Sequence, residues 1–238
     1  MLRGKGFVYE NLNRRVVEFL RDEILWSGRL KHGHHIQEVE IAEELNISRA
    51  PVREALRELE HEGLVEYIPR RGVYVASFDK EDFLEIVDIR YAIESRVYEA
   101  IVKNNRLTPE DFKKLRSMID VMVALAKEET DETGKTAAIA EQDINFHRYI
   151  WEKSGRKWSY KILSNLYYQL RLALMEDWII EQGMAQDLER SVILHYDIVN
   201  CLEKGDVEGA KRILLRHIFT LSQGQETLEK ENIRKILH

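Results

Sequence analysis

The chain has 238 residues, of which 44% are apolar and 33% are charged, and its formal net charge is −6 at pH 7. This composition indicates a helix-rich globular protein with room for two modest domains. No run approaches the roughly 18 apolar residues that cross a bilayer, so membrane insertion is excluded. The single cysteine excludes an internal disulfide framework, and residues 1–15 lack the apolar stretch of a signal peptide, so we expect a cytoplasmic protein.

Residues 1–77 predict three helices followed by a short β-hairpin. Apolar residues recur at helical spacing near residues 10–27, and "EVEIAEEL" fits a second helix. The segment "RAPVREALRELEHEG" fits a third helix, with Ser48 as its cap and Pro51 in its first turn. The runs "LVEYI" and "VYVAS" are short strands joined by the turn "PRRG". This order predicts a winged helix-turn-helix, the fold of many DNA-binding domains.

The third helix carries arginines on one face and apolar residues on another. Arg49, Arg53 and Arg57 recur every four residues, and the apolar stripe consists of Val52, Ala55, Leu56 and Leu59. At about 100° per residue the two stripes lie about 110° apart, so the helix can pack and still present arginines to the major groove. The alternative is that these arginines form solvated ion pairs with glutamates of the same helix.

The turn of the hairpin adds a second basic element. Arg70 and Arg71 are expected to lie against the flanking phosphates or the minor groove, and Gly72 lets the backbone approach closely. Residues 1–77 hold 12 Lys and Arg against 13 Asp and Glu, which leaves this segment at −1. The basic groups must therefore be clustered to bind DNA.

The segment "SRAPVREALRELEHEGLVEYIPRRGVYV" resembles the winged helix-turn-helix of the GntR family of bacterial transcription regulators. The resemblance covers residues near 10–77. It implies binding to double-stranded operator DNA as a homodimer, with Ser48, Arg49 and Arg53 as contacts of the recognition helix and the turn before Gly72 as the wing contact. The chain has His32 where the family often has proline.

Residues 78–238 show at least six helical segments and no convincing strand, which predicts an all-α antiparallel bundle. We place the domain boundary near residue 78. The segment "TPED" at 108–111 supplies a helix cap, and breaks are expected at "SGRK" (154–157), Gly183 and "KGD" (204–206), with Asp206 capping the last of these helices. The tail 225–238 fits an exposed or partner-packed helix. The whole chain is thus expected to be mainly α.

Four polar residues occupy positions in the bundle where the helical pattern expects apolar core: Asp143, His147, His195 and His217. Asp143 and His147 are four residues apart, so both leave the same face of one helix. An aspartate with three imidazoles suits a divalent transition metal such as zinc, nickel, manganese or iron. The alternative for each is a hydrogen-bonded core residue. The histidines at 32, 34 and 35 are expected to lie in a solvated loop.

This bundle resembles the FCD effector domain of the FadR subfamily, on the segments "DIRYAIES", "DINFHRYI", "ILHYDIVNCLEKGDVEGA" and "LLRH". The resemblance spans residues near 78–222. It implies a metal held by Asp143, His147, His195 and His217. Two arginines are candidates to bind the carboxylate of a small organic acid, Arg90 and Arg171, with salt bridges as the alternative for both. Arg90 matches an arginine common at the start of this domain. The chain has Arg156 where the family often has asparagine.

The sequence thus predicts a ligand-responsive transcription regulator with a metal-binding effector domain. Two alternatives remain. One is a metal-dependent, hydrolase-like enzyme with an accessory DNA-binding domain, because open metal positions can also activate water. Against it, the sequence offers no HExxH motif and no identifiable general base beside the ligands. The other is an architectural DNA-binding protein without a ligand.

Overall fold

The computed structural model describes residues 3–127, 132–173 and 188–220. The expected breaks at 154–157 and 204–206 separate helices, whereas Gly183 and the tail 225–238 lie outside the described residues. Two compact units are present. One comprises Met1–Asp79 with Tyr168–Glu176, and the other comprises Lys80–Tyr167 with Asp177–His238.

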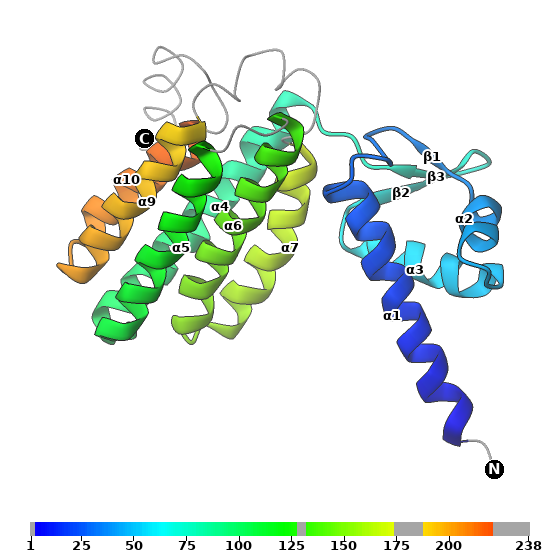
Figure 1. The fold of residues 1–238 in the computed structure, drawn as a ribbon, viewed down its shortest axis with the longest axis horizontal. Coiled ribbons are helices and arrows are strands. Elements are labelled where there is room, and N and C mark those ends of the chain that lie inside the picture. The colour runs from blue at the N-terminus through cyan, green and yellow to red at the C-terminus, as the bar shows by residue number, and fades with distance from the viewer. Residues whose placement is uncertain (1–2, 128–131, 174–187, 221–238) are drawn as a thin grey trace. The chain divides into compact units, whose positions relative to one another are not determined.

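The first unit is a winged helix-turn-helix (Figure 1). Its elements are, in chain order, α1 (Arg3–Leu25), β1 (His35–Ile36), α2 (Glu38–Glu44), α3 (Arg49–His61), β2 (Val65–Ile68) and β3 (Gly72–Val75). The strands form an antiparallel sheet in the order β1-β3-β2, in which Ile68 faces Gly72 and His35 faces Tyr74. The sequence predicted β2 and β3 but missed β1, so His35 lies in a strand and not in the expected loop.

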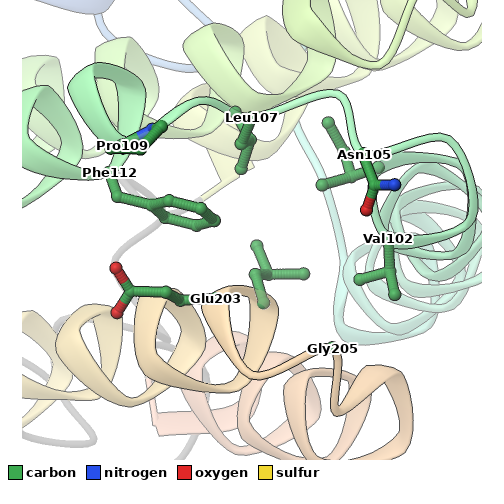
Figure 2. Close-up of a pocket in the computed structure, with 9 residues that line it drawn as sticks. Val102, Asn105, Leu107, Pro109, Phe112, Glu203 and Gly205 are labelled. Atoms are coloured by element: carbon green, nitrogen blue, oxygen red, sulfur yellow. The ribbon is translucent and has the colours of Figure 1, made fainter.

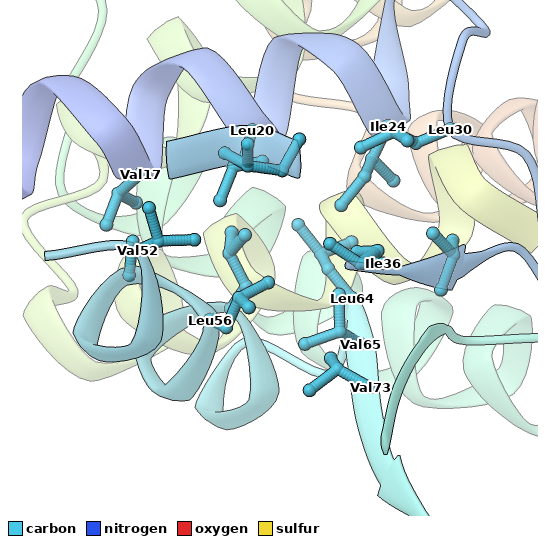
Figure 3. Close-up of a cluster of buried hydrophobic side chains, with 14 of the residues drawn as sticks. Val17, Leu20, Ile24, Leu30, Ile36, Val52, Leu56, Leu64, Val65 and Val73 are labelled. Atoms are coloured by element: carbon cyan, nitrogen blue, oxygen red, sulfur yellow. The ribbon is translucent and has the colours of Figure 1, made fainter. Parts of the chain in front are cut away.

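The core of this unit forms where α1 and α3 face the sheet (Figure 3). The predicted apolar stripe of α3 is confirmed, since all four of its residues are fully buried. They pack with Leu20 and Ile24 of α1 and with Val65 and Val73 of the sheet. Burial of this stripe fixes the rotation of α3 and therefore decides which side chains the helix presents to solvent.

The second unit is built from helices alone within the described residues (Figure 1). They are α4 (Lys80–Lys103), α5 (Pro109–Lys127), α6 (Glu132–Lys153), α7 (Lys157–Ala173), α9 (Leu188–Glu203) and α10 (Val207–Thr220). The last residues of α7, from Tyr168 on, cluster with the first unit. No described helix is long and apolar enough to span a membrane.

Local capping interactions set where two of these helices begin. The backbone N–H of Asp111 donates to Thr108 Oγ1, and the N–H of Thr108 donates to Asp111 Oδ2, a reciprocal capping box at the start of α5. The backbone N–H of Gly209 donates to Asp206 Oδ1 at the start of α10. Both caps agree with the sequence. Ser48 holds the N-cap position of α3, but its side chain makes no capping hydrogen bond.

Candidate functional site

The residues expected to contact DNA all lie exposed on the first unit: Ser48, Arg49, Arg53, Arg57, Arg70, Arg71 and Gly72. The first four belong to α3 or its N-cap, Arg70 and Arg71 to the turn between β2 and β3, and Gly72 to the start of β3. Of these five arginines, only Arg53 forms an ion pair with a carboxylate of the described residues. Its partner is Glu38 of α2 rather than a glutamate of α3. The intrahelical ion pairs that the alternative reading required do not form among the described side chains.

The wing turn has a tightly defined backbone. Gly72 has φ +107°, and a Cβ added there would lie 2.6 Å from Nε2 of His35. The ring of His35 lies against Tyr74, with ring centroids 4.8 Å apart, and the Arg71 guanidinium lies over the Tyr74 ring, 5.9 Å from its centroid. Arg70 has φ +65°, a left-handed conformation at the tip. The turn therefore holds its two arginines outward.

In the second unit the structure brings together Asp143, His147, His195 and His217. Asp143 and His147 come from α6, His195 from α9 and His217 from α10. All four are buried, and one ligand atom from each lies within 4.8 Å of the others. Because three separate helices supply them, only tertiary packing of the bundle makes this cluster.

The donor atoms point at a common centre. His147 Nε2 lies 3.1 Å from His217 Nε2 and 3.3 Å from His195 Nε2. Asp143 Oδ1 lies 3.1 Å from His195 Nε2 and 3.3 Å from His217 Nε2. Two ligands about 2.1 Å from one metal are about 3.0 Å apart at a right angle and about 3.4 Å apart at the tetrahedral angle. These four separations therefore match those of neighbouring ligands around one transition-metal ion.

Partners on the far side of each ring orient the imidazoles. His147 Nδ1 lies 3.4 Å from Glu94 Oε2, His195 Nδ1 lies 3.1 Å from the carbonyl of Val192, and His217 Nδ1 lies 3.0 Å from Ser191 Oγ. A carbonyl only accepts hydrogen bonds, so Val192 places the ring proton of His195 on Nδ1. The carboxylate of Glu94 makes no hydrogen bond of good geometry with His147 Nδ1, but its negative charge favours a ring proton on that atom. The Nε2 atoms of these two residues then face each other as lone pairs, and a shared cation satisfies both.

Burial and neighbouring charges keep this cluster in the protonation state that a metal requires. Burial and the nearby His195 lower the pKa of His217 to about 3, and burial also lowers the pKa of His147 despite the carboxylate of Glu94. Burial alone raises the pKa of Asp143, but His217 and His195 outweigh it and hold that pKa well below its usual range. Burial therefore favours neutral imidazoles at His147 and His217, and Asp143 is a carboxylate, which are the forms that bind a metal.

Arg90, one of the two arginines expected to hold an effector, lies next to this cluster. It is 2% exposed, and its Nε donates to Glu94 Oε1 at 3.0 Å. Nη1 and Nη2 of Arg90 are buried and have no hydrogen-bond partner among the described residues. Burial alone raises the pKa of Glu94, but Arg90 and His147 bring it to about 2, so Glu94 is ionised and links the arginine to a histidine.

Arg171 lies elsewhere. It belongs to the part of α7 that clusters with the first unit, and its guanidinium stacks 5.1 Å from the ring centroid of Trp26. The interaction is a cation–π contact. The second effector candidate therefore belongs to the first unit, whereas the Asp/His cluster belongs to the second.

A groove at one end of the second unit is separate from this cluster (Figure 2). It has a volume of about 320 Å³ and is lined mainly by apolar side chains from the ends of α4, α5 and α9 and from the loop between α4 and α5, among them Val102, Leu107 and Phe112. Its one carboxylate, Glu203, is ion-paired with Arg116 at 2.6 Å. Among the described residues that line it there is neither a histidine nor an arginine.

Comparisons with known proteins assign the chain to a family. Residues 12–75 match the family described as "Bacterial regulatory proteins, gntR family", and residues 85–220 match the FCD domain. The chain belongs to the GntR family and carries an FCD domain. These families and the curated relatives are transcription regulators and not enzymes, so this GntR protein is a DNA-binding transcription regulator, and the enzyme alternative is wrong.

Several relatives align over most of the GntR chain. A probable D-xylose utilization operon transcriptional repressor of Paenarthrobacter nicotinovorans is 30% identical over 86% of the chain and 84% of its own length. The repressor RspR of Escherichia coli K12 is 23% identical over 93% of this chain and 92% of its own length. A gluconate operon repressor of Bacillus subtilis is 32% identical over 64% of the chain and 59% of its own length.

Solved structures share the fold. E. coli McbR/YncC aligns with a TM-score of 0.71 at 21% identity, over 95% of this chain and 97% of that protein. A GntR regulator from Rhodococcus sp. RHA1 aligns with a TM-score of 0.68 at 24% identity, over 93% of this chain and 97% of that protein. These alignments confirm the predicted architecture, a winged helix-turn-helix followed by a helical domain.

Sequence reasoning missed the groups that orient the ligands. Glu94 and Ser191 are fully or almost fully buried, at 0% and 2% exposure, beside His147 and His217. Glu94 lies four residues after Arg90 in the segment "DIRYAIES", and this i,i+4 spacing was an available signal for their ion pair. Nothing in the local sequence marks Ser191, because its role depends on where α10 packs.

Proposed function

We propose that this GntR-family regulator binds a divalent transition metal in its FCD domain and senses a small organic acid there. The observation that supports it is the convergence of three imidazole Nε2 atoms and one carboxylate oxygen in a buried core, where four of the six separations are 3.1–3.3 Å and all lie within 4.8 Å. Four ligands complete a tetrahedral zinc shell, whereas nickel, manganese or iron retains open positions for another ligand.

The acid is proposed to pair with Arg90. Burying a guanidinium with two unpartnered nitrogens is costly, and a carboxylate offers two oxygens in the matching fork geometry. Arg90 adjoins the cluster through Glu94, so one acid can address both the arginine and the metal. Relatives named as repressors of gluconate and D-xylose utilization operons make sugar-derived acids sensible first probes.

The regulator is proposed to act as a homodimer on operator DNA. Two winged domains related by a two-fold axis read two half-sites, and the acid changes DNA affinity by favouring one arrangement of the two domains. Coupling energies of this type are about 1–3 kcal/mol, or about 5- to 150-fold in affinity. Analytical ultracentrifugation of the full chain tests the dimer directly.

Elemental analysis of the purified protein tests the metal site. We expect about one equivalent of metal in the wild type, a large loss in His195→Ala, and no loss in His61→Ala, an exposed histidine at the end of α3 that serves as the matched control. Full metal content in His195→Ala removes that residue from the ligand set.

Operator titrations then test the sensing. With metal-loaded wild type, D-gluconate, L-lactate or citrate is expected to shift operator affinity, and Arg90→Met is expected to lose that response while keeping its metal. If neither chelation nor any acid changes affinity, the protein is an architectural DNA-binding protein instead.

A further inference from the structure

Arg53, in the middle of α3, is held by a carboxylate from another helix. Its Nε lies 3.2 Å from both oxygens of Glu38, and its Nη2 lies 2.8 Å from Glu38 Oε2. Glu38 is the first residue of α2, so this ion pair joins the two helices of the helix-turn-helix. Arg49 and Arg57, one turn to either side, have no such partner among the described residues.

The geometry leaves one edge of the guanidinium free. Arginine has five N–H groups, and Glu38 engages the edge formed by Nε and Nη2. The opposite edge, formed by Nη1 and the second proton of Nη2, is not used by Glu38, and the Arg53 side chain is 50% exposed. Guanine presents O6 and N7 side by side in the major groove, and two parallel N–H groups match this pair of acceptors.

Glu38 also changes what Arg53 attracts. An unpaired arginine on a DNA-facing helix is drawn to any phosphate, whatever the sequence. The carboxylate of Glu38 neutralises most of that attraction, and the hydrogen bond to it raises the pKa of Arg53, so the guanidinium stays charged. It also fixes a side chain that otherwise loses rotamer freedom when it binds.

We propose that Glu38 is a positioning residue that determines specificity, holding Arg53 so that its free edge reads one guanine rather than a phosphate. The proposal rests on the expected base-reading role of Arg53. It assigns to α2 a part in sequence discrimination although α2 itself need not touch a base.

Glu40 provides a matched control. It lies in the same first turn of α2 and carries the same charge, but it is exposed, and its Oε1 accepts from Nε2 of Gln37 at 2.6 Å rather than from Arg53. Removing either glutamate costs α2 a similar favourable interaction with the helix dipole. A difference between the two variants therefore isolates the contact with Arg53.

The experiment selects binding sites from a pool of random duplexes with the full-length wild type, Arg53→Ala, Glu38→Ala, Glu38→Gln and Glu40→Ala. We expect the wild type to prefer guanine at one position of each half-site by about tenfold or more. Arg53→Ala loses this preference, both Glu38 variants reduce it to about two- to threefold, and Glu40→Ala retains it. Preferences at the other positions stay unchanged in the Glu38 variants.

A second readout is the affinity for a duplex without the selected site, which the loss of Glu38 should raise rather than lower. On a duplex without the selected site, Glu38→Ala is expected to bind more tightly than the wild type, with a salt dependence steeper by about one phosphate contact. A glutamate that only tethers α2 would weaken binding to every duplex when removed. Glu38→Gln keeps the size and one acceptor oxygen, so it provides a folded variant if Glu38→Ala is unstable.

Two outcomes overturn the assignment of Glu38. One is a wild-type guanine preference in both Glu38 variants, and the other is an equal loss at every position together with weaker binding to all duplexes. If Arg53→Ala itself keeps the guanine preference, the base-reading role of Arg53 fails, which is a separate result. DNA binding by the family fold stands in each case.

Discussion

The arginine surface of α3 and the Asp/His cluster of the FCD domain are both arrays of polar groups, but they are organised by different means. The arginines lie exposed, and their helix is positioned by an apolar stripe on its other side. The histidines lie buried, and each ring is aligned by a separate polar partner behind it. An exposed site tolerates loose side chains, whereas a buried site must satisfy every donor and acceptor.

This difference determines how each site fails. Removing an exposed arginine takes away one contact and leaves the fold intact. Removing a buried ligand leaves unmatched groups in the core and also abolishes the metal's contribution to stability. The predictions below test this contrast, beginning with the largest expected effect.

Metal binding should stabilise the protein through the cluster. At a free metal concentration about a thousandfold above Kd, the gain in unfolding free energy is about 4 kcal/mol. Calorimetry with and without Zn²⁺ or Ni²⁺ should show a large rise in Tm for the wild type and for His61→Ala, and none for His147→Ala. Equal rises in all three would show that the metal binds elsewhere.

The metal-free protein should lose stability as the pH falls from about 6.5 toward 3. The pKa of His217 is about 3 in the folded chain and 6.5 ordinarily, so between these values the unfolded chain binds a proton that the folded chain does not. Unfolding is then favoured at lower pH, by on the order of a few kcal/mol. The lowered pKa of Asp143 causes a further loss of stability as the pH falls below 3.8, the ordinary pKa of an aspartate.

Denaturant titrations of chelator-treated protein at pH 7, 5.5 and 4 measure how the free energy of unfolding depends on pH. His217→Leu should make the dependence between pH 6.5 and 4 shallower, because position 217 then has no imidazole to protonate, and the lowered pKa of His147 accounts for the part that remains. A slope that is the same in His217→Leu and in the wild type would contradict the role assigned to burial of this ring.

The smallest effects are expected at the wing. Arg70→Ala should weaken binding to operator and to unrelated duplexes alike and lower the salt slope by about one, because a phosphate contact carries no sequence information. Fluorescence anisotropy at several salt concentrations measures it. Arg96→Ala, which removes an exposed arginine of α4, should change neither quantity. A loss confined to operator DNA would mean that Arg70 reads a base.

The residues of both sites were predictable from sequence to different depths. The stripe on α3 and the arginines opposite it follow from spacing alone, because helix periodicity fixes the faces of a single helix. Asp143 and His147 are likewise placed together by their i,i+4 spacing. That His195 and His217 join them depends on how α6, α9 and α10 pack, and here the resemblance to the FCD domain supplied what periodicity could not.

The groups that the sequence did not reveal act across elements. Glu38 meets Arg53 from 15 residues away, and Glu94 meets His147 from a different helix. A two-residue strand such as β1 has no periodicity to detect, so its pairing with β3 was also missed. The sequence does not show to which core Arg171 belongs, because its apolar surroundings read the same whether this part of α7 packs in one unit or in the other.

The contact between His35 and Gly72 has a consequence for variation in the wing. Position 72 disfavours larger side chains for two reasons, its positive φ and the imidazole of His35, which must move to make room for a Cβ. Shortening residue 35 removes the collision but leaves the unfavourable φ, and relaxing the backbone leaves the collision. A wing of different composition therefore requires coordinated changes in the turn and in the segment before α2, two stretches that lie more than thirty residues apart in the chain.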